Sequence, residues 1–340
     1  MDYNHFFNTY GYAPQYGWIG YEKQLSEQDM DIIFHDEFGF GFKPGSATPK
    51  PQPEPTTHKY LTFTANEDDS SVGFCCWSEN MIPVDMGKNM QYSTDGGNTW
   101  QDYTIGVGED NLVTIELNEG ESVMFRGNNE NLAYYLEDED DYIYTKCFIK
   151  GSVAASGDVT ALLNGVGGDA TLASKCYYGM FAGCTGLTQA PALPATTLGE
   201  YCYSGMFFEC TSLTQAPALP ATTLASDCYT GMFAGCTGLT QAPALPATTL
   251  ADNCYNSMFA SCTEINSHDV ETLNNSSDVF LNNLSCASFT IHAETPPTID
   301  FDTITGLKAD CIIYVPAASV DAYKAAEYWS ERANYIQAIA

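Results

Sequence analysis

The sequence is poor in basic residues. Lys and Arg together make up 12 of 340 residues, whereas Asp and Glu make up 43, which gives a formal net charge of -31. No Lys or Arg lies between Lys175 and Lys308. A nucleic-acid-binding surface needs clustered basic side chains, because much of its affinity comes from neutralising phosphates and releasing counterions. The composition therefore argues against a nucleic acid partner.

The sequence also lacks long apolar runs and common catalytic motifs. No run reaches the roughly 18 apolar residues that a membrane-spanning helix needs, so we expect no membrane span. Residues 1–24 have no basic start, no apolar segment and no small-residue cleavage site, which argues against a secretory signal peptide. The phosphate-binding loop, the nucleophile elbow, the H-E-x-x-H motif and any C-x-x-C pair are absent. We therefore expect no enzymatic activity, no cofactor and no metal site.

What the sequence has instead is a 26-residue repeat, which runs from residue 154 to about residue 262. Eight of the 13 cysteines fall in register with it: Cys176, Cys184, Cys202, Cys210, Cys228, Cys236, Cys254 and Cys262. Periods of 20–29 residues with recurring leucine are typical of leucine-rich-repeat solenoids, in which stacked units bury faces that one unit cannot. The strict register predicts buried, reduced packing thiols, with disulfide pairing as the open alternative.

Within one unit, Cys176, Met180 and Cys184 are four residues apart, which predicts about two helical turns with one buried face. The segment 187–190 is predicted to be a strand that stacks on residues 213–216 and 239–242. Equivalent positions of three units hold glutamine, and we take these as the candidate ligand face: Gln189, Gln215 and Gln241. Such repetition suits multivalent attachment, and the alternative is a recent duplication that serves as a spacer.

The remaining residues divide the chain further. We predict an N-terminal docking segment (1–42), a Pro-rich linker (43–57), a β-sandwich (58–150), the solenoid (151–285) and a C-terminal α/β cap (286–340), a mainly β fold with short helices. The cap includes strands at 286–293 and 311–315 and a largely helical segment after Ser319. The aromatic anchors of the docking segment are Phe6, Phe7, Tyr10, Tyr12, Tyr16, Trp18 and Tyr21. The alternative is that this segment packs back on the next domain.

The most enzyme-like motif is Ser93–Trp100, which fits the Asp-box pattern S-x-D-x-G-x-T-W of sialidase propellers. A propeller needs several copies and the sequence has one. An arginine cluster for a sialic acid carboxylate cannot form from Arg126 and Arg332 alone. We therefore interpret the motif as a structural hairpin, in which Asp95 accepts hydrogen bonds from the turn and Trp100 packs beneath it.

Calcium binding and nucleophilic catalysis by cysteine are the remaining candidate chemistries. The acidic run 137–141 and the pair Asp68 and Asp69 could attract Ca²⁺, but neither fits the calcium-loop pattern, and such runs are usually solvated. His268 lies near Cys262 in the sequence, but that cysteine is in the repeat register, which favours a structural thiol over a nucleophile.

The repeat and the C-terminal end resemble the BspA-like leucine-rich-repeat surface proteins of gut anaerobes and their phages. The matching features are the Met-Phe-x-x-Cys-Thr-x-Leu-Thr and Ala-Leu-Pro-Ala-Thr-Thr-Leu blocks and the segment 313–324. The resemblance covers about residues 58–340 and implies an exposed, adhesin-type protein without catalytic residues. Surface members are exported, whereas this sequence shows no signal peptide, so the hypothesis is a phage virion fibre or decoration protein on the virion surface. The alternative is a bacterial cell-surface adhesin.

This hypothesis assigns partners to both ends of the chain. The N-terminal segment is expected to bind a capsid protein or another virion protein. The repeats are expected to contact a host-surface glycan or protein, and a homo-oligomeric assembly is compatible with both roles.

Overall fold

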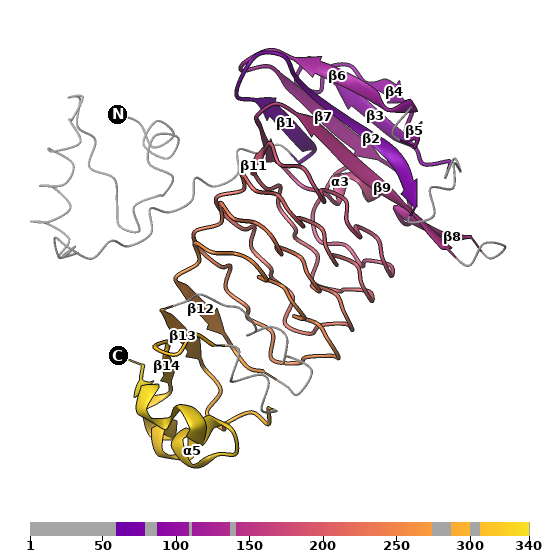
Figure 1. Cartoon of the computed structure of the whole chain (residues 1–340). Helices are drawn as coiled ribbons and strands as arrows, with labels where there is room; N and C mark the ends of the chain where they lie inside the picture. Colours follow the sequence, from indigo (N-terminus) through magenta and orange to yellow (C-terminus); the bar gives the residue numbers. More distant parts are fainter. Residues whose placement is uncertain are drawn as a thin grey trace, which may run out of the picture. The chain divides into compact units, whose positions relative to one another are not determined.

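The computed structural model describes residues 59–78, 87–108, 111–136, 141–273, 287–299 and 307–339. Residues 57–340 form one compact unit. Its described part is mainly β, with several sheets and few short helices (Figure 1). The predicted docking anchors, the Pro-rich linker, Cys286 and residues 137–140 of the acidic run lie outside the described residues.

Between residues 58 and 151 the sequence has seven short β-rich runs separated by turn-forming residues, which predict strands: 59–65, 71–77, 90–94, 100–104, 112–117, 121–127 and 144–151. Each run contains a strand. These strands are β1 (Leu61–Ala65), β2 (Ser70–Ser78), β3 (Met90–Ser93), β4 (Gln101–Tyr103), β6 (Val113–Leu117), β7 (Ser122–Gly127) and β9 (Asp141–Lys150). The structure adds three short strands that the prediction missed: β5 (Gly106–Val107), β8 (Ala133–Leu136) and β10 (Val153–Ser156).

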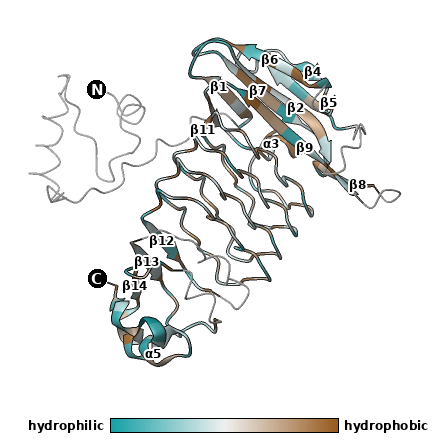
Figure 2. Ribbon diagram, in the orientation of Figure 1, coloured by the Kyte–Doolittle hydropathy of each residue, from teal (hydrophilic) through white to brown (hydrophobic). Residues whose placement is uncertain are grey.

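Most of these strands form two sheets that pack on each other. One has the order β11–β10–β1–β7–β3–β4, where β11 is Leu187–Gln189. The other has the order β5–β2–β9–β8, with β6 also paired to β2. Aromatic side chains fill the space between them: the ring of Phe74 lies 5.0 Å from that of Phe125 and 6.2 Å from that of Phe63. Figure 2 shows hydrophobic residues concentrated along β1 and β7 of this core.

The first sheet continues into the repeat. Strand β10 pairs with β1 on one side and, in parallel, with β11 of the first repeat unit on the other. The short helix α3 (Ala161–Asn164) follows β10 and packs against β7. The ring of Phe63 lies 6.2 Å from that of Phe181, so the sheets and the repeat share one hydrophobic core.

Each 26-residue unit forms one coil of a stack, and the two predicted helical turns at its start are wrong. The chain there makes consecutive tight turns instead. The amide N–H of Met180 donates to the carbonyl oxygen of Tyr177, three residues back, at 3.2 Å. The next amide, that of Phe181, donates to Met206 of the following coil at 2.9 Å. Alternate amides therefore close a turn or join two coils, and no i to i−4 helical ladder forms.

The physical reason for the error is a period close to that of a helix. The turns direct two side chains inward and the next two outward, so buried positions recur every four residues. Left-handed backbone at Lys175, Gly179 and Gly183, with φ of 60°, 57° and 76°, interrupts any helix at the same interval. A repeat of four residues and a helical period of 3.6 residues place apolar side chains at nearly the same spacing.

Aromatic ladders fill the interior of the stack. One ladder consists of Tyr177, Tyr203, Tyr229 and Tyr255, and the other of Phe181, Phe207, Phe233 and Phe259. Neighbouring phenylalanine rings lie 5.5 to 5.6 Å apart with their planes within 5°. Complete burial of one such side chain stabilises a fold by about 1.5–3 kcal/mol. Each coil covers the rings of its neighbour, so the stacking supplies burial that a single coil lacks.

The predicted strand of the unit forms only in the first copy, as β11. Residues 213–216 and 239–242 are not strands, and that part of the prediction is wrong. Copies two and three are joined there by a weaker contact, in which the amide of Thr240 donates to the carbonyl oxygen of Thr214 at 3.4 Å. The prolines that follow each segment lack the N–H that a regular ladder requires.

The C-terminal part contains a parallel sheet of the order β12–β13–β14–β15, formed by Ser267–Val270, Ser288–Ile291, Ile312–Val315 and Ile336–Ala338. Strands β13 and β14 lie within the two predicted segments. The 3-10 helix η3 (Ala317–Ser319) leads into α5 (Val320–Ala325). The predicted long helix is replaced after α5 by the 3-10 helix η4 (Trp329–Tyr335) and by β15.

This part is held together by side-chain hydrogen bonds to the backbone. Helix α5 begins after Ser319, as predicted, but the Ser319 hydroxyl donates to the carbonyl oxygen of Glu294 and caps no helical amide. The indole N–H of Trp329 donates to Pro297 at 2.9 Å, and its ring lies edge-on to that of Tyr323 at 5.1 Å. Both rings are fully buried.

Candidate functional site

The three glutamines of the predicted ligand face are exposed at equivalent positions of successive coils. The residue two positions before each glutamine is a fully buried leucine, which anchors that segment to the core: Leu187, Leu213 and Leu239. The centroids of equivalent aromatic rings in neighbouring coils lie 5.5 to 6.2 Å apart. The glutamines occupy equivalent positions of the same coils, so they follow one another along the stack in the same order as the rings. Each amide group can donate and accept hydrogen bonds, so the column is a polar, uncharged surface that can contact a repetitive ligand.

A second exposed column consists of threonines. Thr171 pairs with Thr197, and Thr223 pairs with Thr249, each through a parallel bridge between coils. At the start of this column the carboxylate of Asp169 accepts hydrogen bonds from the amide and the hydroxyl of Thr196, at 2.9 and 3.0 Å. These bonds lower the pKa of Asp169 below its usual value. The outward positions of the repeat are therefore mostly small and polar.

The eight repeat cysteines are buried thiols, and none of the eight is in a disulfide. The thiol of Cys210 donates to the carbonyl oxygen of Phe181 at 3.1 Å, and that of Cys236 donates to Phe207 at 3.0 Å. Burial raises the pKa of Cys176 to about 12. Because the thiolate is the nucleophilic and metal-binding form, these positions suit packing and not chemistry.

His268 and Cys262 do not form a catalytic pair. His268 is buried against the ring of Phe259, with centroids 4.9 Å apart, and burial lowers its pKa to about 4. The Cys262 thiol donates to the carbonyl oxygen of Phe233 at 3.0 Å, and burial raises its pKa to about 12. A thiol that stays protonated and an imidazole of such low basicity are poorly suited to nucleophilic attack.

The Asp-box residues form the hairpin between β3 and β4. The carboxylate of Asp95 accepts hydrogen bonds from the Thr99 amide at 2.9 Å, the Thr99 hydroxyl at 2.6 Å and the Ser93 hydroxyl at 2.7 Å. The Thr99 hydroxyl is the largest of the influences that lower the pKa of Asp95 to about 2. Gly96 and Gly97 have φ of 74° and 86°, conformations that the turn requires and that glycine adopts readily. The motif is thus internally bonded, as the hairpin interpretation predicts.

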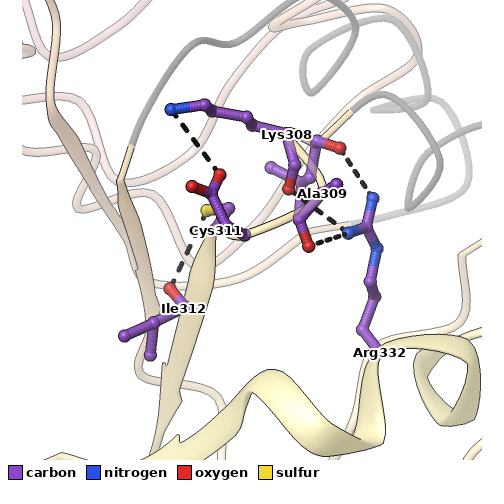
Figure 3. Close-up of polar contacts among 7 residues, drawn as sticks. Lys308, Ala309, Cys311, Ile312 and Arg332 are labelled. Atoms are coloured by element: carbon purple, nitrogen blue, oxygen red, sulfur yellow. Dashed lines mark hydrogen bonds and ion pairs between the residues drawn. The ribbon is translucent and has the colours of Figure 1, made fainter.

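Both arginines are used within the fold. Arg126 lies 4.1 Å from the centre of the Trp100 ring and donates two hydrogen bonds to the side chain of Gln91. Arg332 donates to three consecutive carbonyl oxygens, those of Leu307 at 2.6 Å and of Lys308 and Ala309 at 3.2 Å (Figure 3). Neither arrangement presents a guanidinium fork to a sugar carboxylate, so the sialidase alternative gains no support from them.

Of the two calcium candidates, the structure describes Asp68 and Asp69 but only the last residue of the acidic run 137–141. The carboxylate of Asp68 accepts the amide of Glu119 at 3.0 Å, and Asp69 has a left-handed φ of 58°, which identifies a turn. In the described ranges, no group of three or more His, Cys, Asp or Glu side chains could hold a metal ion. The acidic run 137–141 cannot be placed, because residues 137–140 lie outside those ranges.

Comparison with protein-family models and with curated proteins finds no match to this chain. The function must therefore be inferred from the molecule itself. Among the described residues, no helix is both long enough and apolar enough to cross a membrane.

One surface was missed by the sequence analysis. Six residues form a continuous set of ring and ammonium contacts, which we call the aromatic–lysine strip: Trp77, Tyr142, Tyr144, Lys146, Lys175 and Tyr178. It joins β2 and β9 to the first coil. The alternation of aromatic and lysine side chains over residues 142–148 indicates part of this strip in the sequence. The residues of the first coil cannot be assigned to it from the sequence, because they join it only where β9 packs on that coil. The amide of Cys147 in β9 donates to the carbonyl oxygen of Met180 at 2.7 Å.

Proposed function

We propose that this chain is a non-enzymatic display protein, in which a β-sandwich precedes a leucine-rich-repeat solenoid with a C-terminal α/β cap. The observation that carries the proposal is the register of the coils, which places Gln189, Gln215 and Gln241 on the surface at equivalent positions. A repetitive surface of this kind makes weak contacts additive through multivalency. The rigid core of stacked rings beneath it keeps the spacing of those contacts fixed.

The site of display in this proposal is the surface of a phage virion. The aromatic N-terminal segment would bind a capsid or other virion protein through the seven anchors named above. The linker 43–57 has prolines that favour an extended conformation and would hold the following domains away from the particle. The resemblance to BspA-like repeat proteins of gut anaerobes and their phages supports this placement, and a bacterial cell-surface adhesin is the second candidate for the same modules.

One localisation experiment separates the two candidates. Antibodies against the β and repeat regions would be applied to purified phage particles and to intact cells of the organism that encodes the chain. Gold label on particles, with the chain present in their mass spectrum, is the result expected for a virion fibre or decoration protein. Label confined to the cell surface would replace it with the adhesin, and label on neither would overturn display altogether.

The docking role has its own test. A variant that lacks residues 1–42 should keep the circular dichroism spectrum and solubility of the full chain but no longer join the particle. A variant with alanine at Phe6, Phe7 and Trp18 would show whether the aromatic side chains are responsible. Assembly of both variants at the level of the full chain would contradict an N-terminal anchor.

A further inference from the structure

The outer face of β9 is unlike the rest of the protein surface. Successive side chains of a strand point to opposite faces. The inward ones are buried: Ile143, Thr145 and Cys147. The residues between them, Tyr142, Tyr144 and Lys146, lie on the other face. Tyr142 and Lys146 are partly exposed there, whereas Tyr144 is only 4% exposed. The register sets Trp77 of β2 directly opposite Tyr144, with ring centroids 6.5 Å apart.

The first coil extends this face. The ring of Tyr144 is stacked at 4.6 Å on that of Tyr178 and at 6.1 Å on that of Tyr142, and the planes are within 26° and 14°. Beside them Tyr135 of β8 lies 4.8 Å from Tyr142 and is 39% exposed. Tyrosine combines a large apolar ring with a hydroxyl that donates and accepts hydrogen bonds. A row of such rings suits a ligand with both apolar C–H faces and many hydroxyl groups.

Two ammonium groups lie on the strip. Lys175 Nζ is 3.8 Å from the centre of the Tyr142 ring, and Lys146 Nζ is 5.3 Å from the centre of the Trp77 ring. Cation–π attraction holds each of them at the surface. Within the described part of the chain, neither ammonium forms an ion pair with a carboxylate. Lys146 and Lys175 are two of only 12 basic residues in a chain with 43 acidic ones, so two ammonium groups in one place set this surface apart.

We propose that the aromatic–lysine strip binds a glycan whose sugars carry carboxylate groups. The partly exposed rings of Trp77, Tyr142 and Tyr178 would contact the sugar rings. Lys146 and Lys175 would take the carboxylates, and the buried ring of Tyr144 supports the exposed rings by stacking. This inference rests on the proposed display function and adds to it a second attachment surface, on the sheet and first coil, and the chemistry of the ligand. The glutamine column contributes no charge to it.

Single-stranded nucleic acid also uses aromatic rings and lysines, but it fits this molecule less well. Every nucleotide carries a negative charge, and affinity grows with the number of phosphates that basic residues neutralise. The strip offers two ammonium groups on a chain of net charge -31, which repels a polyanion over long range. A glycan with sparse carboxylates places its charge at the strip and extends the rest of its length as a neutral chain.

The test measures equilibrium binding of the full chain to matched acidic and neutral sugars. Saturation-transfer NMR detects the contact, and calorimetry gives the affinity. The acidic probes are 3′-sialyllactose and 6′-sialyllactose, each with one carboxylate. Their neutral counterpart is lactose, and an oligothymidylate represents nucleic acid. We expect at least one acidic probe to bind more tightly than its neutral counterpart, with affinity that falls as salt is added.

Variants then place the site. Lys146→Gln combined with Lys175→Gln should weaken binding by about tenfold or more, because both charge contacts are lost. The corresponding double Arg variant should restore it in part. Tyr134→Ala, on the opposite face of β8, and Lys324→Gln, on α5, should leave the affinity unchanged, as should alanine at all three glutamines. Circular dichroism checks that each variant is folded.

Three outcomes would overturn the inference: neither acidic probe binds, the double Gln variant binds as well as the parent chain, or oligothymidylate binds the strip more tightly than the sugars. Its failure is distinguishable from failure of the proposed function. A chain that labels the particle surface but binds no acidic sugar retains display and loses this site. A chain that binds the sugars but labels neither particles nor cells loses display alone.

Discussion

The ring of Tyr177 lies parallel to the ring of Tyr203, with centroids 5.6 Å apart and planes within 9°. Their hydroxyl groups nevertheless have different surroundings. The Tyr177 hydroxyl donates to the carbonyl oxygen of Val159 at 3.1 Å. Those of Tyr203 and Tyr229 are buried and have no hydrogen-bond partner among the described residues. A buried polar group without a partner costs about 1–3 kcal/mol, so the inner members of this ladder carry a penalty that the first member avoids.

This difference predicts opposite effects of the same substitution. Tyr203→Phe removes a hydroxyl that makes no bond, and should leave the free energy of unfolding unchanged or raise it by about 1 kcal/mol. Tyr177→Phe removes the bond to Val159 and should lower it by about 1 kcal/mol. Urea denaturation followed by circular dichroism measures both. Equal destabilisation by the two variants would mean that the Tyr203 hydroxyl has a partner after all, such as a buried water.

Left-handed backbone in the second coil gives another prediction. Glu209 has φ of 56°, whereas the equivalent residues of the first and third coils are Gly183 and Gly235. The left-handed conformation costs a non-glycine residue about 1–2 kcal/mol, and glycine loses about 0.4–1 kcal/mol through the entropy of its unfolded chain. Glu209→Gly should therefore raise the free energy of unfolding by about 0.5–1 kcal/mol.

The converse variant is the control for that prediction. Gly231 has φ of 61°, and a Cβ added there would meet no atom within 4 Å, so Gly231→Ala tests strain without a steric clash. It should lower stability by about as much as Glu209→Gly raises it. If both changes lower stability, Glu209 makes side-chain contacts that outweigh its backbone strain.

The sheets were the most predictable part of the chain. Each of the seven β-rich runs contains a strand, because each is rich in β-forming residues and lies between clear turn formers such as Asp95–Asn98. The missed strands have physical reasons. Strand β5 has only two residues and pairs in parallel with β2, and β10 is short and gains its pairing from β1 and from the distant β11. Pairings across such distances cannot be read from local alternation.

The repeat shows where local patterns are insufficient. Its period and its buried positions followed from the sequence, but its backbone did not, because period-four turns resemble helical spacing. Glycine at 179 and 183 was a sequence signal against a helix, as glycine is unfavourable in a helix interior. In the candidate sites, the exposed glutamines could be expected from the repeat alone. The aromatic–lysine strip could not, because Lys175 and Tyr142 meet only through tertiary packing.

The Asp-box hairpin predicts an effect at low pH. Asp95 has a pKa of about 2, below its ordinary 3.8, because Thr99 and Ser93 donate to the carboxylate. A folded-state pKa below the unfolded one means that the stabilisation is present above about pH 4 and is lost as the pH falls toward 2. Asp95→Ala should lower the thermal midpoint at pH 7, and the difference from the parent chain should disappear near pH 2. A constant difference across that range would contradict the assignment.

The buried thiols predict the behaviour at high pH. The ordinary thiol pKa of 9.0 is raised by burial to about 11 for Cys254 and about 12 for Cys176 and Cys262. Because the folded-state pKa lies above the unfolded one, the folded chain retains these protons while the unfolded chain releases them. The associated stability is complete below about pH 9 and is lost as the pH rises toward 11 or 12. Urea denaturation between pH 7 and 11 should show a free energy of unfolding that falls steadily above pH 9. Cys254→Val, which keeps an apolar side chain of similar size, should reduce the slope of the free energy of unfolding against pH. A flat profile of the parent chain up to pH 11 would show that the ladder thiols ionise as readily in the folded chain as in the unfolded one.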